Sequence, residues 1–135
     1  MSVRQLRLVV TVDDAVYDEV VALYRDQLGL AAEGAFTEPD GGRVSILSAG
    51  RATLEITDTT HAGYIDRVEV GRRVAPKFRL ALEVDDAEAA TAAAAGAGAS
   101  VLAAPVRTPW DSLNSRLDVP GGVQLTLFQE LGPDS

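Results

Sequence analysis

The sequence repeats itself at a spacing of 72 residues, and this repeat limits the folds that the chain can adopt. The stretch "LRLVVTVDDA", which begins at Leu6, and the stretch "FRLALEVDDA", which begins at Phe78, agree at six of ten positions, including Arg7 and Arg79. Each stretch is typical of an apolar strand followed by two aspartates that favour the start of a helix. A chain of 135 residues therefore has room for two copies of one unit that share a core.

The elements expected after each copy come in the same order. In the first half, "DEVVALYRDQLGL" has apolar residues at helical spacing, and strands are expected near residues 30–36, in "RVSILSAG" and in "RATLEITD". In the second half, "AEAATAAAAGAGA" predicts a helix, and "SVLAAPV", "SLNSRLDV" and "GVQLTLFQE" predict three strands. The sequence thus predicts an α+β fold in one domain, residues 1–135, with βαβββ modules at about 3–60 and 77–130. The polar connection at 61–76 is interpreted as a linker or a lid.

The geometry of a single module explains why two of them would occur in one domain. A βαβββ unit covers one face of its sheet with its helix and leaves the other face open, so two units can enclose a cup between their open faces. Because side chains alternate along a strand, Leu6, Leu8 and Phe78 are expected under the helices. The opposite parity predicts the cup-facing side chains, which are Arg7, Glu55, Arg79, Glu83, Asn114, Arg116 and Thr126.

Composition excludes several classes of partner. A net charge of −8 argues against a nucleic-acid or anionic-membrane binder, since such proteins need a basic face. No apolar run approaches the ~18 residues of a membrane span, and the N-terminus does not look like a signal peptide. The absence of cysteine excludes disulfides and thiolate sites. We expect a cytoplasmic protein, and the heavy use of alanine, glycine, valine and arginine is typical of a bacterial gene of high GC content.

Four motifs in this order resemble those of the vicinal oxygen chelate superfamily, which includes glyoxalases, bleomycin resistance proteins and extradiol dioxygenases. They are "VTVDDA", "LYRDQLGL", "ATLEITD" and "DVPGGVQLTLFQ". The resemblance runs from about Leu6 to Gln129. It implies a cup-shaped mixed β-sheet, a small-molecule ligand in the cup and assembly as a homodimer.

The resemblance also implies where a metal would lie in the metal-dependent members, which hold it with histidine, glutamate or glutamine at four inward positions. Those positions correspond here to Arg7, Glu55, Arg79 and Thr126, and only Glu55 is a usual ligand. Arginine offers donors only, so it cannot coordinate a cation. The only histidine, His61, falls in the connection and is expected to be solvated. We therefore expect neither a metal nor another cofactor.

The predicted function is that of a metal-independent, bleomycin-resistance-like protein that binds a small organic or aromatic molecule for resistance or sequestration. Arg7, Arg79 and Arg116 would give polar contacts to the ligand, and Trp110 would stack on it, with Tyr64 a weaker candidate. A competing interpretation is that Arg7, Glu55 and Arg79 form an ion cluster that only fills the cup.

Two further interpretations stay open. The chain could be a lyase, isomerase or epimerase of the same superfamily, with Glu55 or Glu83 as the base and an arginine stabilising an enolate-like anion. Glu83 could instead pair with Arg116. A cup plugged by its own side chains would make the protein an interaction module.

Overall fold

All eight strands join in one mixed sheet in the computed structural model, which describes residues 2–132. The strand order is β2-β3-β4-β1-β5-β8-β7-β6. The first half supplies β1 (Val3–Val12), α1 (Tyr17–Ala22), β2 (Ala32–Thr37), β3 (Arg43–Ala49) and β4 (Ala52–Asp58). The second half supplies β5 (Phe78–Val84), α3 (Ala87–Gly96), β6 (Ser100–Arg107), β7 (Ser112–Val119) and β8 (Val123–Glu130). The predicted α+β fold and the order of its elements are confirmed.

The start of each module helix follows the aspartate chemistry expected from the repeat. Asp13 accepts a hydrogen bond from the backbone N–H of Ala15 in a short 3₁₀ turn that leads into α1, and Asp86 caps α3 by accepting from Ala89. Beyond α1, residues 23–27 continue as a π-helical turn that ends before Gly29, whose φ of 79° suits only glycine without strain. The helices are therefore shorter than the apolar pattern predicted.

The two repeated strands lie side by side at the centre of the sheet. β1 and β5 run antiparallel, and Leu8 of the first copy pairs with Leu80, its equivalent in the second. β4 lies parallel to β1 and places Glu55 beside Val9, whereas β8 lies parallel to β5 and places Thr126 beside Ala81. Val9 and Ala81 are equivalent, so Glu55 and Thr126 occupy matching positions in the two modules.

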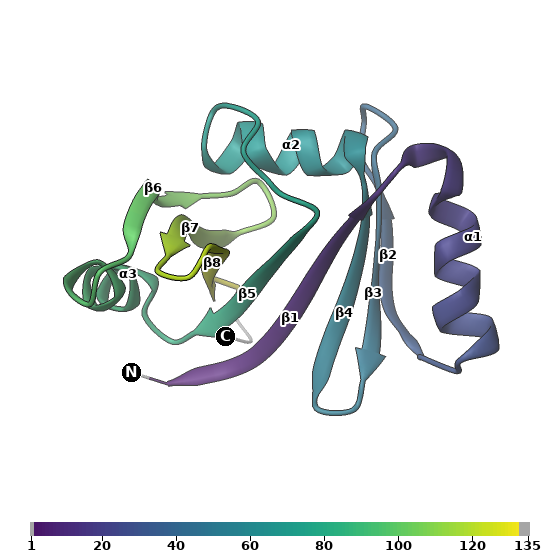
Figure 1. The fold of residues 1–135 in the computed structure, drawn as a ribbon, viewed down its shortest axis with the longest axis horizontal. Helices are drawn as coiled ribbons and strands as arrows, with labels where there is room; N and C mark the ends of the chain where they lie inside the picture. Colours follow the sequence, from purple (N-terminus) through teal and green to yellow (C-terminus); the bar gives the residue numbers. More distant parts are fainter. Residues whose placement is uncertain (1, 133–135) are drawn as a thin grey trace.

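The convex side of the sheet has two separate cores with an uncovered strip between them. α1 packs on Val12, Leu47 and Ile56, and α3 packs on a second group formed by Val84, Leu117 and Leu127. In Figure 1, α1 and α3 lie at opposite ends of the sheet and leave the middle of β1 and β5 open. The prediction that Leu6, Leu8 and Phe78 are covered by helices is wrong, because these short helices stop short of the centre and leave them 42%, 38% and 55% exposed.

Much of the connection between the modules is a helix, whereas the sequence suggested an irregular linker or lid. α2 (Thr59–Glu69) crosses the other side of the sheet (Figure 1). Asp58 caps its first turn by accepting from the N–H of His61 at 2.8 Å, and Asp14 accepts from the backbone and hydroxyl groups of Thr59 and Thr60. No helix among residues 2–132 is long and apolar enough to cross a membrane.

Candidate functional site

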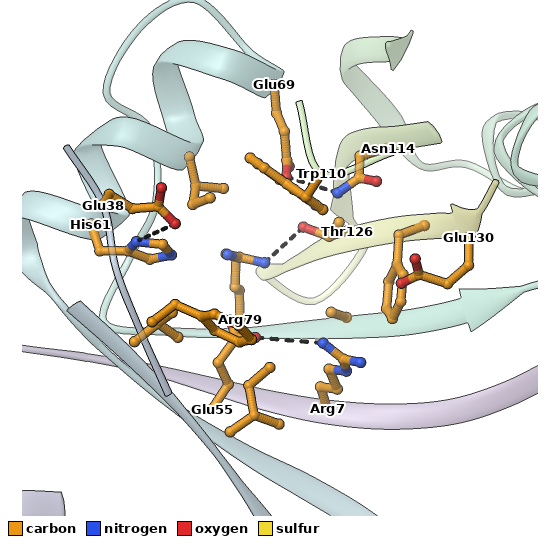
Figure 2. Close-up of a pocket in the computed structure, with 16 residues that line it drawn as sticks. Arg7, Glu38, Glu55, His61, Glu69, Arg79, Trp110, Asn114, Thr126 and Glu130 are labelled. Carbon is orange, nitrogen blue, oxygen red and sulfur yellow. Dashed lines mark hydrogen bonds and ion pairs between the residues drawn. The ribbon is translucent and has the colours of Figure 1, made fainter. Parts of the chain in front are cut away.

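A cavity of about 340 Å³ lies on the concave side of the sheet, beneath α2. Its apolar wall consists of Phe36, Val44, Ile46, Ile65, Ala81, Trp110 and Phe128. Its polar wall consists of Arg7, Glu38, Glu55, His61, Glu69, Arg79, Asn114, Thr126 and Glu130 (Figure 2). Both modules and α2 therefore contribute to one mixed apolar and charged site, and the cup is not filled by its own side chains.

Arg7 and Glu55 form an ion pair on the side of the cavity that belongs to the first module. Arg7 Nη1 lies 3.7 Å from Glu55 Oε1, and the two side chains are 22% and 16% exposed. The Arg7 Nε–H donates to Gln5 Oε1 at 2.8 Å, and the guanidinium carbon lies 4.9 Å from the centroid of the Phe128 ring. The charge of Arg7 is thus offset by a carboxylate and by an aromatic face.

Arg79 occupies the equivalent position in the second module but lacks an acidic partner. Its residue exposure is 8%, and its Nη1 donates to the Thr126 hydroxyl at 2.8 Å. No carboxylate of residues 2–132 lies within ion-pair distance of Arg79, so the predicted cluster of two arginines around Glu55 is reduced to the pair with Arg7. Burial lowers the pKa of Arg79, the charge of Arg116 adds to this effect, and the carboxylates of Glu69, Glu55 and Asp66, beyond ion-pair distance, oppose it. The cavity therefore holds a buried cation whose one hydrogen-bond partner is neutral.

Arg116 does not line the cavity, contrary to the prediction that it contacts a ligand. It is fully buried, and its guanidinium binds Asp66 Oδ1 at 2.8 Å and Glu69 Oε1 at 2.9 Å, both on α2. Its Nη1 also donates to Gln124 Oε1 at 2.9 Å. Arg116 points from β7 toward the overlying helix, which the strand pattern could not reveal. It holds α2 over the sheet, and no hydrogen bond or ion pair among residues 2–132 joins it to Glu83.

Asp66 is the central acceptor in this anchor. Burial raises its pKa, but the backbone N–H groups of Ala75 and Val74 and the guanidinium of Arg116 outweigh that effect, so the pKa of Asp66 lies below its ordinary value. The two N–H groups donate to Asp66 Oδ2 at 2.9 and 2.8 Å. The carboxylate thus fixes both α2 and the loop that follows it.

His61 is a wall residue of the cavity, and the prediction that it is solvated is wrong. It lies in the first turn of α2 with 5% exposure, and its Nδ1 is 3.9 Å from Glu38 Oε1. Burial lowers its pKa to about 4, so the imidazole is neutral at physiological pH. The close fit requires Gly42, because a Cβ atom there would lie 2.6 Å from the His61 backbone nitrogen.

The sequence matches a glyoxalase-like domain over residues 9–128. The chain belongs to this family. Its fold is that of the glyoxalase, bleomycin resistance and dioxygenase superfamily, and no curated protein matches the sequence significantly.

Three solved structures illustrate how widely this fold is shared. A hypothetical protein from Bacillus halodurans C-125 is 16% identical, with a TM-score of 0.70 and coverage of 96% of each chain. Methylmalonyl-CoA epimerase from Mycobacterium tuberculosis is 20% identical over 98% of this chain and 91% of that one, with a TM-score of 0.67. A glyoxalase/bleomycin resistance protein/dioxygenase superfamily member from Vibrio splendidus 12B01 is 12% identical over 96% and 100%, with a TM-score of 0.61. At these identities the likeness concerns the fold alone.

The four side chains that the resemblance places at the metal positions of metal-dependent members do not fit a divalent cation. Two are guanidinium groups, Glu55 is paired with Arg7, and the Thr126 hydroxyl accepts from Arg79. Within residues 2–132, no three His, Cys, Asp or Glu side chains are grouped so that they could hold a metal ion. Two fixed positive charges at this place would repel Zn²⁺, Ni²⁺ or Fe²⁺.

The remaining predicted residues divide into those at the cavity and those away from it. Trp110 lines the cavity at 41% exposure, with its ring centroid 6.2 Å from that of Tyr64, which is not a lining residue. Asn114 also lines the cavity, but its Nδ2 donates to Glu69 Oε2 at 2.9 Å and is thereby occupied. Glu83 is not a lining residue, so it is not beside Glu55 as a second base.

Glu130 is the carboxylate that lies where Glu83 was expected. It lines the cavity, and burial together with the charge of Glu83 raises the pKa of Glu130. The strand alternation that puts Thr126 on the concave side also puts Glu130 there, so this signal could have revealed it.

The other lining residues that sequence reasoning missed lie on α2 and in or next to β2 and β3. His61, Ile65 and Glu69 recur every four residues, which places them on one face of a helix, and all three line the cavity. This spacing could have revealed them if the segment had been recognised as helical. Glu38 follows β2 and carried no such signal.

Proposed function

We propose that this protein binds a small organic acid in its cavity without a metal ion, with the acid group on Arg79. The supporting observation is a buried guanidinium that faces the cavity and whose one hydrogen-bond partner among residues 2–132 is the Thr126 hydroxyl. A buried cation without a counterion is costly, and an entering carboxylate would offset that cost through charge-assisted, bidentate hydrogen bonds. An acid group on the ligand would therefore supply the negatively charged partner that Arg79 lacks.

The surrounding carboxylates favour a ligand with a single negative charge. Glu55 is paired with Arg7, and Glu69 is paired with Arg116. Glu38 and Glu130 also line the cavity, and neither is paired with an arginine or lysine of residues 2–132. A second anionic group on the ligand would lie near one of them, so a monocarboxylate fits better than a phosphate dianion.

The ligand body is proposed to be flat and apolar. Phe36, Trp110 and Phe128 supply aromatic surface on the cavity walls, and Ile46 and Ile65 add aliphatic surface. Aromatic walls with a few placed polar groups are typical of small-molecule sites. We accordingly favour an aromatic monocarboxylic acid, taken up for sequestration or resistance in the bacterial cytoplasm.

A homodimer is part of this proposal. Leu6, Leu8 and Phe78 form an exposed apolar strip on the convex side of the sheet, and a second copy would cover it. Sedimentation equilibrium of the wild type and of a Leu8→Lys variant tests the strip. A dimer in the first and a monomer in the second are expected, whereas a monomeric wild type would remove this part of the proposal.

The test of the proposed function is a titration on metal-stripped protein. Trp110 is the sole tryptophan and lies at the cavity, so its fluorescence reports on occupancy. We expect aromatic monocarboxylates to bind one per chain in the presence of EDTA. Arg79→Met should weaken that binding by about 100-fold, since a hydrogen-bonded charge contributes about 2–3 kcal/mol. Binding that needs added metal, or that survives in Arg79→Met, would contradict the proposal.

An enzyme of the same superfamily is the second candidate, because Glu55 lines the cavity and can reach a ligand held on Arg79. In that case Glu55 would remove a proton next to the acid group, and Arg79 would stabilise the resulting enolate. Exchange of the α-proton of bound phenylacetate for deuterium, followed by NMR, separates the candidates. Exchange that disappears in Glu55→Gln while binding persists would establish the enzyme; no exchange would favour simple binding.

A further inference from the structure

We propose that His61 accepts a hydrogen bond from a ligand hydroxyl, so that the cavity selects hydroxy-substituted aromatic monocarboxylic acids over their unsubstituted analogues. This inference rests on the proposed function, which supplies the acid contact on Arg79. It adds a second polar contact that comes from α2 instead of the sheet.

The geometry of the imidazole carries the inference. His61 is 5% exposed, and its Nδ1 is buried without a hydrogen-bond partner among residues 2–132, with Glu38 Oε1 at 3.9 Å as the nearest acid group. A proton on Nδ1 is directed toward that carboxylate and is stabilised by it. The other ring nitrogen, Nε2, then carries the lone pair, and it lies on the side of the ring that faces the cavity and Arg79 (Figure 2).

The ring is held in place by its surroundings. The His61 N–H donates to Asp58, and the residue packs against the backbone of Gly42. Farther along the helix, Arg116 anchors Asp66 and Glu69 from below. The acceptor therefore does not have to be ordered when a ligand enters, which lowers the entropic cost of binding.

Burial and Arg79 keep His61 neutral and accepting, against the carboxylates that face it. Burial is the largest effect on its pKa, the carboxylates of Asp58 and Asp40 oppose it, and Arg79 reinforces it. Glu38 lies at Nδ1, and Tyr64 of the same helix presents its ring at a centroid distance of 6.2 Å. The pKa of about 4 leaves the imidazole unprotonated at pH 7.

A ligand held on Arg79 meets this acceptor on the opposite wall. A hydroxyl group there would satisfy Nε2, whereas an unsubstituted ring would remove water from Nε2 and give nothing in exchange. Leaving a buried polar atom unpaired is more costly than a neutral hydrogen bond is stabilising, which is why sites of this kind discriminate strongly. The expected preference for the hydroxy acid is at least about tenfold.

Matched acid pairs test the inference by calorimetry at pH 7. The pairs are benzoate and 4-hydroxybenzoate, phenylacetate and 4-hydroxyphenylacetate, and 3-phenylpropanoate and 3-(4-hydroxyphenyl)propanoate, which vary the distance between acid and hydroxyl. We expect the hydroxy acid to bind at least about tenfold more tightly in one pair or more. In His61→Phe the preference should fall below about twofold, while the unsubstituted acids keep their affinity. Tyr64→Phe, on the same helix but outside the cavity lining, should retain the preference.

The outcomes separate the two proposals. If acids bind without any hydroxyl preference, or if the preference survives in His61→Phe, the inference about His61 is wrong and the proposed function stands. If no acid binds to the folded wild type, both are overturned.

A second measurement avoids reliance on a variant. His61 is the only histidine of the chain, so ¹⁵N labelling of histidine in protein without a histidine tag gives one pair of ring resonances. We expect an Nδ1-protonated imidazole, with an Nε2 resonance that moves upfield when the hydroxy acid binds and not when its unsubstituted partner binds. An Nε2-protonated ring, or an equal response to both acids, would refute the inference.

Discussion

Each module has an arginine beside a matching position of the neighbouring strand, but the two arginines have different partners there. In the first module, Arg7 meets the carboxylate of Glu55 at 3.7 Å. In the second, Arg79 donates to the hydroxyl of Thr126 at 2.8 Å and has no ion-pair partner in the described part of the chain. One exchange of a carboxylate for a hydroxyl thus separates a compensated charge from one that is available to a ligand. The more deeply buried arginine is the one without a counterion, which is the reverse of what stability alone would favour.

Arg116 is fully buried and has two acidic partners, so its replacement should cause the largest loss of stability. Arg116→Met leaves Asp66 and Glu69 buried without their partner, so the free energy of unfolding should fall by about 3–5 kcal/mol. Urea denaturation followed by circular dichroism measures this. Arg107→Met, which removes an exposed ion pair with Asp111, is the control and should change it by less than about 0.5 kcal/mol. Equal losses in the two variants would contradict the role of Arg116 as the anchor of α2.

Thr126→Glu makes the second module resemble the first. A carboxylate beside Arg79 should neutralise it, so binding of aromatic monocarboxylates should weaken by about 100-fold, the loss also expected for Arg79→Met. Calorimetry measures the affinity. Thr126→Val is the matched control, because it removes the hydroxyl and leaves the charge of Arg79 free. Tight acid binding in Thr126→Glu would show that Arg79 is not the acid contact.

The pH dependence of stability tests the charge balance around His61. In the unfolded chain its pKa is about 6.5, and in the folded protein it is lowered to about 4. As the pH falls, the unfolded state therefore takes up the proton first, and stability is lost from about pH 6.5 down to about pH 4. Between pH 7 and pH 5, the free energy of unfolding of the wild type should fall by about 2 kcal/mol more than that of His61→Phe. Urea titrations at both pH values measure it, and parallel losses in the two proteins would contradict a buried neutral imidazole.

Glu55→Gln should give the smallest change. It removes the counterion of Arg7, but the pair is partly exposed, so the free energy of unfolding should change by less than about 1 kcal/mol. The freed charge should also make acid binding a few-fold tighter, as calorimetry can measure. A loss as large as that of Arg116→Met would show that the first pair is a structural anchor and would remove the contrast between the modules.

The β-sheet could be predicted from the sequence because its strands alternate regularly. Parity alone put Glu55 and Thr126 on the concave side and Ile56 and Leu127 in the two cores, as observed. The prediction of which apolar residues a helix covers was weaker, because strand parity gives the face of a side chain and not the length of the helix above it. For that reason Leu6 was expected to be buried and is 42% exposed.

The helix over the cavity could not be predicted in the same way. α2 faces the sheet with Asp66 and Glu69, which are buried through ion pairs and hydrogen bonds instead of apolar contacts. A helix packed in this manner lacks the apolar stripe by which an amphipathic helix is recognised. The missed site residues on α2 follow from this cause, and so does the misplacement of Arg116.

The pairing of Leu8 with Leu80 at the centre of the sheet places a pseudo-twofold axis between the two modules. A cup with perfect twofold symmetry would accept any unsymmetrical molecule in two opposite orientations with equal energy. The exchange of Glu55 for Thr126 across that axis removes this degeneracy, because only one of the two arginines is left to attract an acid. The difference between the two modules would thereby hold the ligand in a single orientation.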